Sequence, residues 1–217
     1  MIAMILAAGR GERLRPKTDT SPKALVEVAG RSLLERHLDA IKAAGIETVV
    51  INLGWLGEQI VARIGSGSRY GLDVIYSPEG DHVLETGGGI HRALPLLGAG
   101  PFLVVNADIY TDMALPTHDL ADGVMAHLVL VPTPSHKRGG DFDLVEGRVR
   151  NSDTPELTFS GVAMYRPSFF AACAPGRFPL APMLRSAAAA GTLAGSLYCG
   201  LWEDVGTPER LAALNRG

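Results

Sequence analysis

Runs of hydrophobic residues alternate with amphipathic segments through the first half of the chain. Continuous hydrophobic runs are typical of strands that are buried on both faces, whereas the amphipathic segments have helical spacing. Ser32 and Glu35 match a capping box that predicts a helix start, and Gly45 is placed to end that helix. The predicted order is strand 1–8, helix 32–44, strand 47–53, helix 55–64, strand 72–77, helix 89–97 and strand 101–107.

The second half of the chain has a different pattern, with shorter strands and a hairpin. Glu146-Gly147 separates two polar-apolar segments and predicts the hairpin turn. Thr207 is a predicted helix cap, and Pro208 suits the first position of that helix. The remaining predicted elements are strands 125–131, 141–145, 148–150, 157–165, 193–199 and 201–205, helix 180–190 and the helix that follows Thr207.

Alternating strands and helices predict an α/β fold with right-handed crossovers and a mostly parallel sheet. The 217 residues suit one domain, and no internal repeat is visible. In such sheets ligands bind beyond the carboxyl ends of the strands. Two polar features, the loop from Gly9 to Arg13 and Asp108, lie at predicted carboxyl ends, so we expect the functional site there.

Composition narrows the possible partners. The formal net charge of -3 argues against a nucleic-acid-binding protein but leaves room for a small anionic ligand in a local positive pocket. The apolar stretch from Met1 to Ala8 is too short to span a membrane and is followed by charges, unlike a signal peptide, so we expect a cytoplasmic protein. Cys173 and Cys199 form no metal-binding pair and are predicted to be small buried hydrophobic residues.

The strongest chemical signal is the segment LAAGRGERLRP at 6–16, which is followed by Ser-Pro-Lys at 21–23. Gly9 and Gly11 allow a tight turn whose backbone N–H groups form an anion site, and Arg13 and Lys23 add positive charge. A dinucleotide fingerprint would need glycine where Leu14 stands, and no P-loop motif is present. We therefore predict a phosphate-binding loop of another kind. None of the six histidines is expected to be catalytic, and Trp55 and Phe142 are expected to pack rather than to stack on a ligand.

Asp108 follows a predicted buried strand, where a carboxylate is placed to hold a hard cation or to cap a turn. Asp204 lies in the segment WEDVGT at 202–207, and the alternation of a strand turns it away from the side that Glu203 faces. From the residues alone, both functional and structural roles remain open for these aspartates.

Together these motifs resemble those of the sugar-1-phosphate nucleotidyltransferases, and the likeness runs over nearly the whole chain. Within that family the chain is most similar to the uridylyltransferases that act on N-acetylmuramate 1-phosphate. Other stretches that carry the likeness include GSRYG at 67–71, SPEG at 77–80, LETGGGI at 84–90 and TFSG at 158–161.

The resemblance implies a Rossmann-like three-layer sandwich with a mixed central sheet, with a nucleotide-binding half at about 1–110 and a sugar-binding half at about 111–217. It implies Mg²⁺ held by Asp108 and Asp204, with UTP and a sugar 1-phosphate as substrates and a monomer or small homo-oligomer as the assembly. The family departs from this chain in usually having glycine at the position of Ala107, a difference of one methyl group.

The resemblance also distributes roles over the candidate residues. The triphosphate would bind Gly9, Gly11, the backbone N–H of Glu12, Arg13 and Lys23, with Asn106 beside it. The three glycines of the segment LETGGGI would let a base lie on the backbone at Thr86 and Gly87. The sugar would lie near Asp141, Asn151 and Asp153, for which a solvated hairpin is the alternative interpretation. Lys137 and Arg138 are cationic candidates for contact with the carboxylate of a muramyl sugar.

Alternatives remain at this point. The same chemistry suits glucose 1-phosphate with dTTP or UTP, or mannose 1-phosphate with GTP. A non-catalytic domain that binds a sugar nucleotide and regulates a partner is the alternative from another class, although it has less need of paired metal-binding carboxylates. A dehydrogenase is the weakest alternative, because the third glycine of its fingerprint is missing.

Overall fold

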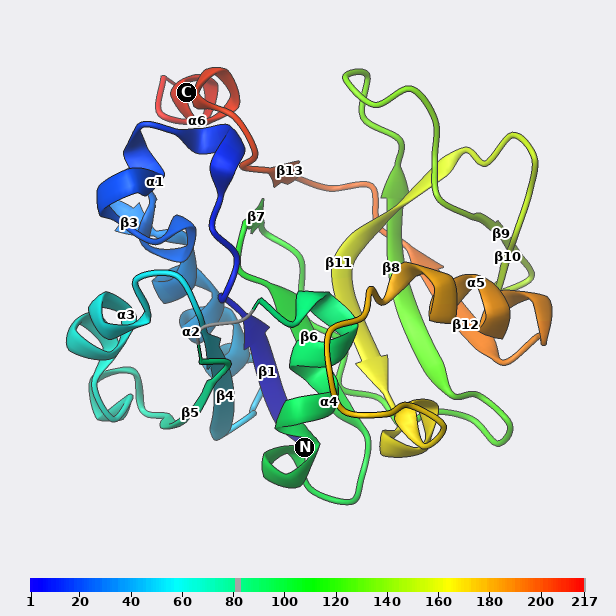
Figure 1. Ribbon diagram of the computed structural model, residues 1–217. Coiled ribbons are helices and arrows are strands. Elements are labelled where there is room, and N and C mark those ends of the chain that lie inside the picture. The colour runs from blue at the N-terminus through cyan, green and yellow to red at the C-terminus, as the bar shows by residue number, and fades with distance from the viewer. Residues whose placement is uncertain (81–82, 217) are drawn as a thin grey trace.

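A nine-stranded mixed sheet forms the centre of the molecule in the computed structural model, which describes residues 1–80 and 83–216 (Figure 1). Its strand order is β5-β4-β1-β6-β11-β8-β12-β10-β9. The first four strands are parallel, β11 runs antiparallel to both of its neighbours, and β12 is again parallel to β8. The strands are β1 (Ile2–Leu6), β4 (Thr48–Leu53), β5 (Asp73–Pro78), β6 (Phe102–Asn106), β8 (Ala126–Pro132), β9 (Asp143–Val145), β10 (Arg148–Arg150), β11 (Leu157–Tyr165) and β12 (Leu193–Leu197).

Helices cover both faces of this sheet and make three layers. On one face lie α4 (Glu85–Leu97) and α5 (Ala181–Ala189), and on the other lie α2 (Leu33–Ala43) and α3 (Gly57–Ile64) (Figure 1). Each face has its own core: Ile5 of β1 packs with the α2 and α3 side, and Met4 packs with the α4 and α5 side. This alternation along a fully buried strand explains why β1 is a continuous hydrophobic run, and it confirms the predicted α/β fold with a mixed sheet.

Two small ribbons and several short helices connect these layers. The ribbon formed by β7 (Ile109–Thr111) and β13 (Trp202–Asp204) lies beyond the carboxyl end of β6, beside α6 (Pro208–Leu214) (Figure 1). Around α1 and α6, Leu14, Val205 and Leu211 form a third buried cluster. The other elements are α1 (Lys17–Thr20), β2 (Glu27–Val28), β3 (Arg31–Ser32) and the 3-10 helices η1 (Glu12–Leu14), η2 (Lys23–Leu25), η3 (Ser68–Tyr70) and η4 (Pro167–Phe170).

Local sequence signals account for most of these boundaries. Ser32 and Glu35 form the predicted capping box of α2, Gly45 adopts the left-handed conformation just after it, and the hydroxyl of Thr207 accepts from Arg210 N at the start of α6. The hairpin turn at Glu146-Gly147 is also confirmed, with positive φ at both residues.

Three expectations differ from the structure. Helix α4 begins at Glu85, four residues before the predicted start at Gly89, because close tertiary packing outweighs the poor helix propensity of three glycines. Strands β2, β3 and β7 and helix α1 were not predicted, since two to four residues are too few to show a period. Cys199 is exposed and Cys173 is half-buried, so neither is the fully buried hydrophobic residue that was expected.

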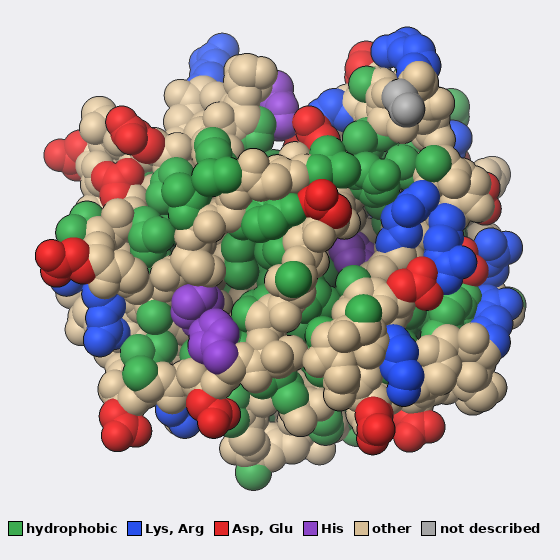
Figure 2. All heavy atoms as spheres, turned by 180° about the vertical axis from the view of Figure 1, so that it is seen from behind, with side chains coloured by type: hydrophobic (Ala, Val, Ile, Leu, Met, Phe, Trp, Pro, Cys, Tyr) green, Lys and Arg blue, Asp and Glu red, His purple; other side chains and the backbone are tan. Residues whose placement is uncertain are grey.

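Basic and acidic side chains are mixed on the surface, in agreement with the small net charge of the sequence. The back of the molecule carries basic side chains interspersed with acidic ones on the side of α2 and α3 (Figure 2), where Arg31 pairs with Asp39 and Arg63 with Glu35. No helix in the described ranges is both long and apolar enough to cross a membrane.

The Glu35 carboxylate is largely buried and accepts more hydrogen bonds than an ordinary surface carboxylate. Burial would raise its pKa, but hydrogen bonds from Ser32, Arg63 and Tyr70 outweigh burial and lower the pKa from 4.5 to about 2. A carboxyl group with a depressed folded-state pKa stabilises the fold above its unfolded pKa, and this contribution is lost as the pH falls toward the folded value.

We therefore predict that Glu35→Gln lowers the free energy of unfolding by about 2 kcal/mol at pH 7. The difference from wild type should shrink between pH 4.5 and about 2, where the wild-type carboxyl group is itself protonated. Urea unfolding followed by circular dichroism across this pH range measures the effect. A difference that stays constant with pH would contradict the assigned role of the charge.

Candidate active site

The loop after β1 is held against the carboxyl ends of the neighbouring strands. Ala7 N donates to Asn52 Oδ1 at the end of β4 (2.6 Å), and Ala107 N after β6 donates to Leu6 O (3.1 Å). The loop then turns at Gly11, whose φ of 66° is left-handed. A Cβ atom on Gly11 would lie 3.0 Å from the side chains of Lys23 and Thr18, so the turn needs glycine for space as well as for conformation.

Lys23 and Asp108 face each other across the mouth of this loop. Lys23 Nζ lies 2.5 Å from Asp108 Oδ2, and the two side chains are 13% and 33% exposed. They share a cavity of about 210 Å³ whose wall comes from the ends of four parallel strands and the start of α4. It is lined by Leu6, Ala7, Ala8, Gly9, Lys23, Ala24, Asn52, Glu79, Val83, Glu85, Thr86, Asn106, Ala107 and Asp108.

The β7–β13 ribbon brings Asp204 to the same place. In its register Asp204 pairs with Ile109, the residue after Asp108, and Val205 N donates to Asp108 O (2.8 Å). A second, adjoining cavity is lined by Gly9, Gly11, Glu12, Arg13, Lys23, Asp108 and Gly206. The loop at residues 9–13, which we call the glycine-arginine loop, therefore lies next to Lys23 and to both segments that carry the aspartates.

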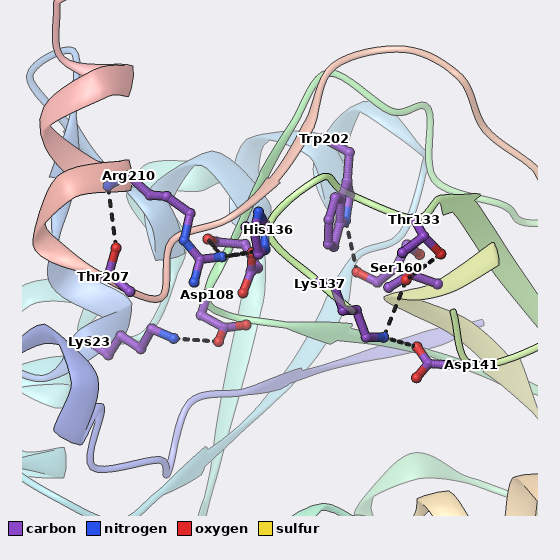
Figure 3. A network of polar contacts seen from close by, with 12 residues as sticks. Lys23, Asp108, Thr133, His136, Lys137, Asp141, Ser160, Trp202, Thr207 and Arg210 are labelled. Carbon is purple, nitrogen blue, oxygen red and sulfur yellow. Dashed lines mark hydrogen bonds and ion pairs between the residues drawn. The ribbon is translucent and has the colours of Figure 1, made fainter. Parts of the chain in front are cut away.

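Basic side chains surround the carboxylate of Asp204. Arg210 of α6 donates to it, and His136 Nε2 lies 3.3 Å from Asp204 Oδ1. Figure 3 shows Arg210 and His136 side by side. A Cβ atom on Gly206 would lie within 3.4 Å of Arg13, Asp204 and Arg210, which places all three side chains around this glycine. Sequence reasoning missed Arg210 and His136 as neighbours of Asp204. The sequence contained a signal for Arg210, because it follows the Thr207 helix cap and so lies in the first turn of the helix next to Asp204. It contained no signal for His136, which lies in a loop.

Two carboxylates with nearby cavities fit a magnesium ion. Mg²⁺ takes oxygen ligands, keeps several waters and is commonly bound through one or two carboxylates together with substrate phosphates. Within the described residues no group of three or more His, Cys, Asp or Glu side chains is placed to bind a metal. Asp108 and Asp204 could thus hold the ion only jointly with oxygens of a ligand or water, and their partial exposure leaves them open to it.

The glycine-rich start of α4 is enclosed by protein. A Cβ atom on Gly87 would lie 2.5 Å from the Phe178 ring, one on Gly88 would lie 2.2 Å from Gly176 O, and one on Gly89 would lie 2.6 Å from Glu79 Oε1. Phe178 also exchanges two backbone hydrogen bonds with Leu84 and Gly88. The three glycines are therefore required for packing, a reason that the sequence did not reveal, while Thr86 lines the cavity of about 210 Å³.

The predicted sugar residues are less concentrated. Asp141 Oδ2 accepts from Lys137 Nζ (2.6 Å) and from Phe159 N (3.0 Å), so this carboxylate and Lys137 already satisfy each other (Figure 3). Asn151 donates to Arg185 O (2.9 Å), and Asp153 is exposed. None of these three predicted sugar residues is among the residues that line the two cavities.

Two histidines are held neutral by burial, and the two aromatic residues that were expected to pack do so. Burial lowers the pKa of His37 and of His127 to about 4, which keeps both neutral at pH 7. Phe142 is buried, and Trp55 packs under Arg10 and donates to Thr18 O (2.9 Å). His82 lies outside the described residues.

Comparisons with known proteins identify the family of the chain. Residues 3–150 match the model of the MobA-like NTP transferase domain. The chain is 49% identical to an N-acetylmuramate alpha-1-phosphate uridylyltransferase of Neisseria meningitidis, over 97% of this chain and 95% of that protein. It is 38% identical to a protein of the same name from Caulobacter vibrioides, over 98% and 95% of the two chains.

Solved structures share the fold at low sequence identity. The crystal structure of HddC from Yersinia pseudotuberculosis superposes with a TM-score of 0.79, at 20% identity over 99% of this chain and 98% of that one. A Bacillus anthracis protein that is provisionally described as a glucose-1-phosphate thymidylyltransferase reaches 0.86, at 19% identity over 100% and 94% of the two chains.

The packing of α4 leads to a prediction about stability. Gly88→Ala should lower the free energy of unfolding by about 2 kcal/mol or more, because its methyl group meets backbone rather than a movable side chain, and this outweighs the better helix propensity of alanine. Urea unfolding measures the change. Gly100→Ala, where a Cβ atom meets nothing within 4 Å, is the matched control and should be close to neutral. Equal stability of the two variants would show that α4 does not need the contact.

Proposed function

The chain belongs to the sugar-1-phosphate nucleotidyltransferases that carry a MobA-like NTP transferase domain, and on this premise we propose that it is a uridylyltransferase. Its reaction joins UTP and N-acetylmuramate 1-phosphate, and the products are the UDP-sugar and pyrophosphate. The names of the two relatives that match nearly end to end support this choice of base and sugar. The reaction would take place in the cytoplasm and return muramic acid to peptidoglycan synthesis.

One observation carries the proposal: Lys23, Asp108 and Arg13 line one or both of the adjoining cavities, and Asp204, from a distant part of the chain, lies beside Arg13 around Gly206 at their edge. A site that only bound a neutral sugar would not need this density of charge. Transfer of a nucleotidyl group needs it, because two anions, a sugar phosphate and a nucleoside triphosphate, have to be brought together.

The triphosphate binds at the glycine-arginine loop in this proposal. Backbone N–H groups at Gly11 and Glu12 and the guanidinium group of Arg13 face the β- and γ-phosphates, while the Glu12 carboxylate stays in solvent. Lys23 lies between the two cavities and neutralises charge near the α-phosphate. Pyrophosphate, the leaving group, remains against Arg13 as the bond breaks.

No general base is needed, because the attacking phosphate oxygen is already ionised at neutral pH. Bound Mg²⁺ would supply Lewis-acid stabilisation of the α-phosphate. Asp108 and Asp204 would hold the metal, and Lys23 and Arg210 would exchange their contacts with these carboxylates for contacts with phosphate oxygens. The chain thus contributes orientation and fixed charge.

The remaining residues would contact the base and the sugar. Thr86, Gly87 and Asn106 would contact the nucleotide, in keeping with the position of Thr86 and Asn106 on the cavity of about 210 Å³. Residues 1–110 would form the nucleotide-binding half and 111–217 the sugar-binding half. Within the latter, Asp141 with Lys137, then Asn151 and Asp153, would contact the sugar, and Lys137 offers a cation to the carboxylate of a muramyl group.

The two-aspartate assignment can be tested by substitution. We predict that Asp108→Asn and Asp204→Asn each lower kcat by about 10²–10³ or more, with the fold unchanged by circular dichroism, because each removes a metal-binding charge. Asp122→Asn, at an exposed position away from the cavities, is the matched control. Pyrophosphate release measures turnover, and near-normal kcat in either variant would overturn the assignment.

The substrate pair can be tested with a panel. We predict the highest kcat/KM for UTP with N-acetylmuramate 1-phosphate, compared with UTP or dTTP with glucose 1-phosphate and GTP with mannose 1-phosphate. Pyrophosphate release in the presence of Mg²⁺ is the readout. A preference for another pair would replace the sugar or base while leaving the reaction class in place, and nucleotide binding without any turnover would favour a regulatory domain.

A further inference from the structure

A chain of hydrogen bonds runs along the wall of the cavity of about 210 Å³ and joins the loop after β1 to the residue before α4. Ala7 N donates to Asn52 Oδ1 (2.6 Å), Asn52 Nδ2 donates to Glu79 Oε1 (2.7 Å), and Leu84 N donates to Glu79 Oε2 (3.0 Å). Asn52 and Glu79 are only 3% and 6% exposed. We refer to these two side chains with their backbone partners as the Asn52–Glu79 relay.

The direction of each hydrogen bond in the relay is fixed. A backbone N–H can only donate, so Ala7 requires the oxygen of the Asn52 amide, which turns the NH₂ group of Asn52 toward Glu79. The Glu79 carboxylate accepts from Asn52 with one oxygen and from Leu84 with the other. A carboxylate kept from water needs such donors, so the three bonds form one interdependent set.

Both ends of the relay lie beside proposed ligand contacts. Ala7 comes two residues before Gly9, which lines both cavities, and Leu84 comes two residues before Thr86. The relay is also close-packed, since a Cβ atom on Gly89 would lie 2.6 Å from Glu79 Oε1 and 3.0 Å from Asn52 Nδ2. Movement at one end therefore displaces the other.

We propose that Asn52 and Glu79 are positioning residues that fix the distance between the phosphate-binding loop and the base-binding start of α4. They act through Ala7 and Leu84: both side chains belong to the cavity wall but are almost fully buried, and their polar atoms are engaged with each other and with the backbone. A nucleoside triphosphate has to contact both segments at once, so this distance determines its affinity. The inference rests on the proposed nucleotide site but not on the identity of the sugar.

The fixed directions allow a rescue experiment. Glu79→Gln puts an NH₂ group opposite either Asn52 or Leu84, so two donors face each other and one link is lost. Asn52→Asp places two carboxylates against each other. In the double variant N52D/E79Q, the introduced carboxylate accepts from Ala7 and from the introduced amide, whose oxygen accepts from Leu84. Every link is restored with the middle bond reversed and with no change in net charge.

We expect each single variant to raise the KM for UTP and the Kd for UTP with Mg²⁺ by about 10-fold or more, since a buried polar group loses its partner. The double variant should return both values to within about 3-fold of wild type. Calorimetry at pH 8 and 20 °C measures Kd, pyrophosphate release measures KM, and thermal unfolding checks that each variant is folded. Glu58→Gln, at an exposed position of α3, is the matched control.

A purely structural role would lower Tm in the single variants and leave Kd and KM unchanged well below that temperature. That result, or a folded double variant that binds UTP no better than the single variants, would overturn the relay. Wild-type protein that binds UTP but turns over no sugar phosphate would instead overturn the proposed function. The relay would still be tested in that case, because the Kd for UTP does not depend on turnover.

Discussion

The pairing of β7 with β13 is the constraint on which the site depends. Asp108 and Asp204 are far apart in sequence, and they come together because Asp204 is in register with Ile109 and because Val205 N donates to Asp108 O. The ribbon also carries Gly206 to the glycine-arginine loop, beside Arg13. Without this ribbon the glycine-arginine loop would remain an anion site of modest specificity. With it, basic and acidic groups converge where a metal-bound triphosphate would lie.

The charges at the site balance one another. Lys23 contacts Asp108, and Arg210 contacts Asp204, so each carboxylate has a cation of its own. The same cations suit phosphate oxygens, which means that binding of a metal nucleotide exchanges one set of charge pairs for another and leaves no charge unpartnered. In the proposed reaction this arrangement would lower the repulsion between the two anionic substrates.

Most of the fold was predictable from the sequence because its signals are local. Buried strands such as β1 are continuous hydrophobic runs, and the caps at Ser32 and Thr207 are short motifs with a known geometry. The candidate site was predictable as a set of motifs by family likeness. Other features were not predictable. Strand β7 is too short to show a pattern, and the contacts of His136 and Arg210 with Asp204 exist only after folding. The glycines of α4 are required because of residues that lie elsewhere in the chain, namely Phe178, Gly176 and Glu79.

The central claim is that the two aspartates and the glycine-arginine loop converge on one metal-bound triphosphate. A crystal structure with Mn²⁺ and a non-hydrolysable UTP analogue tests it most directly, because anomalous scattering locates the metal independently of any assumed ligands. The account predicts an anomalous peak within coordination distance of Asp108, Asp204 and the α-phosphate, with the terminal phosphates against Gly11 and Arg13. A metal bound away from either carboxylate, or phosphates bound away from that loop, would contradict it.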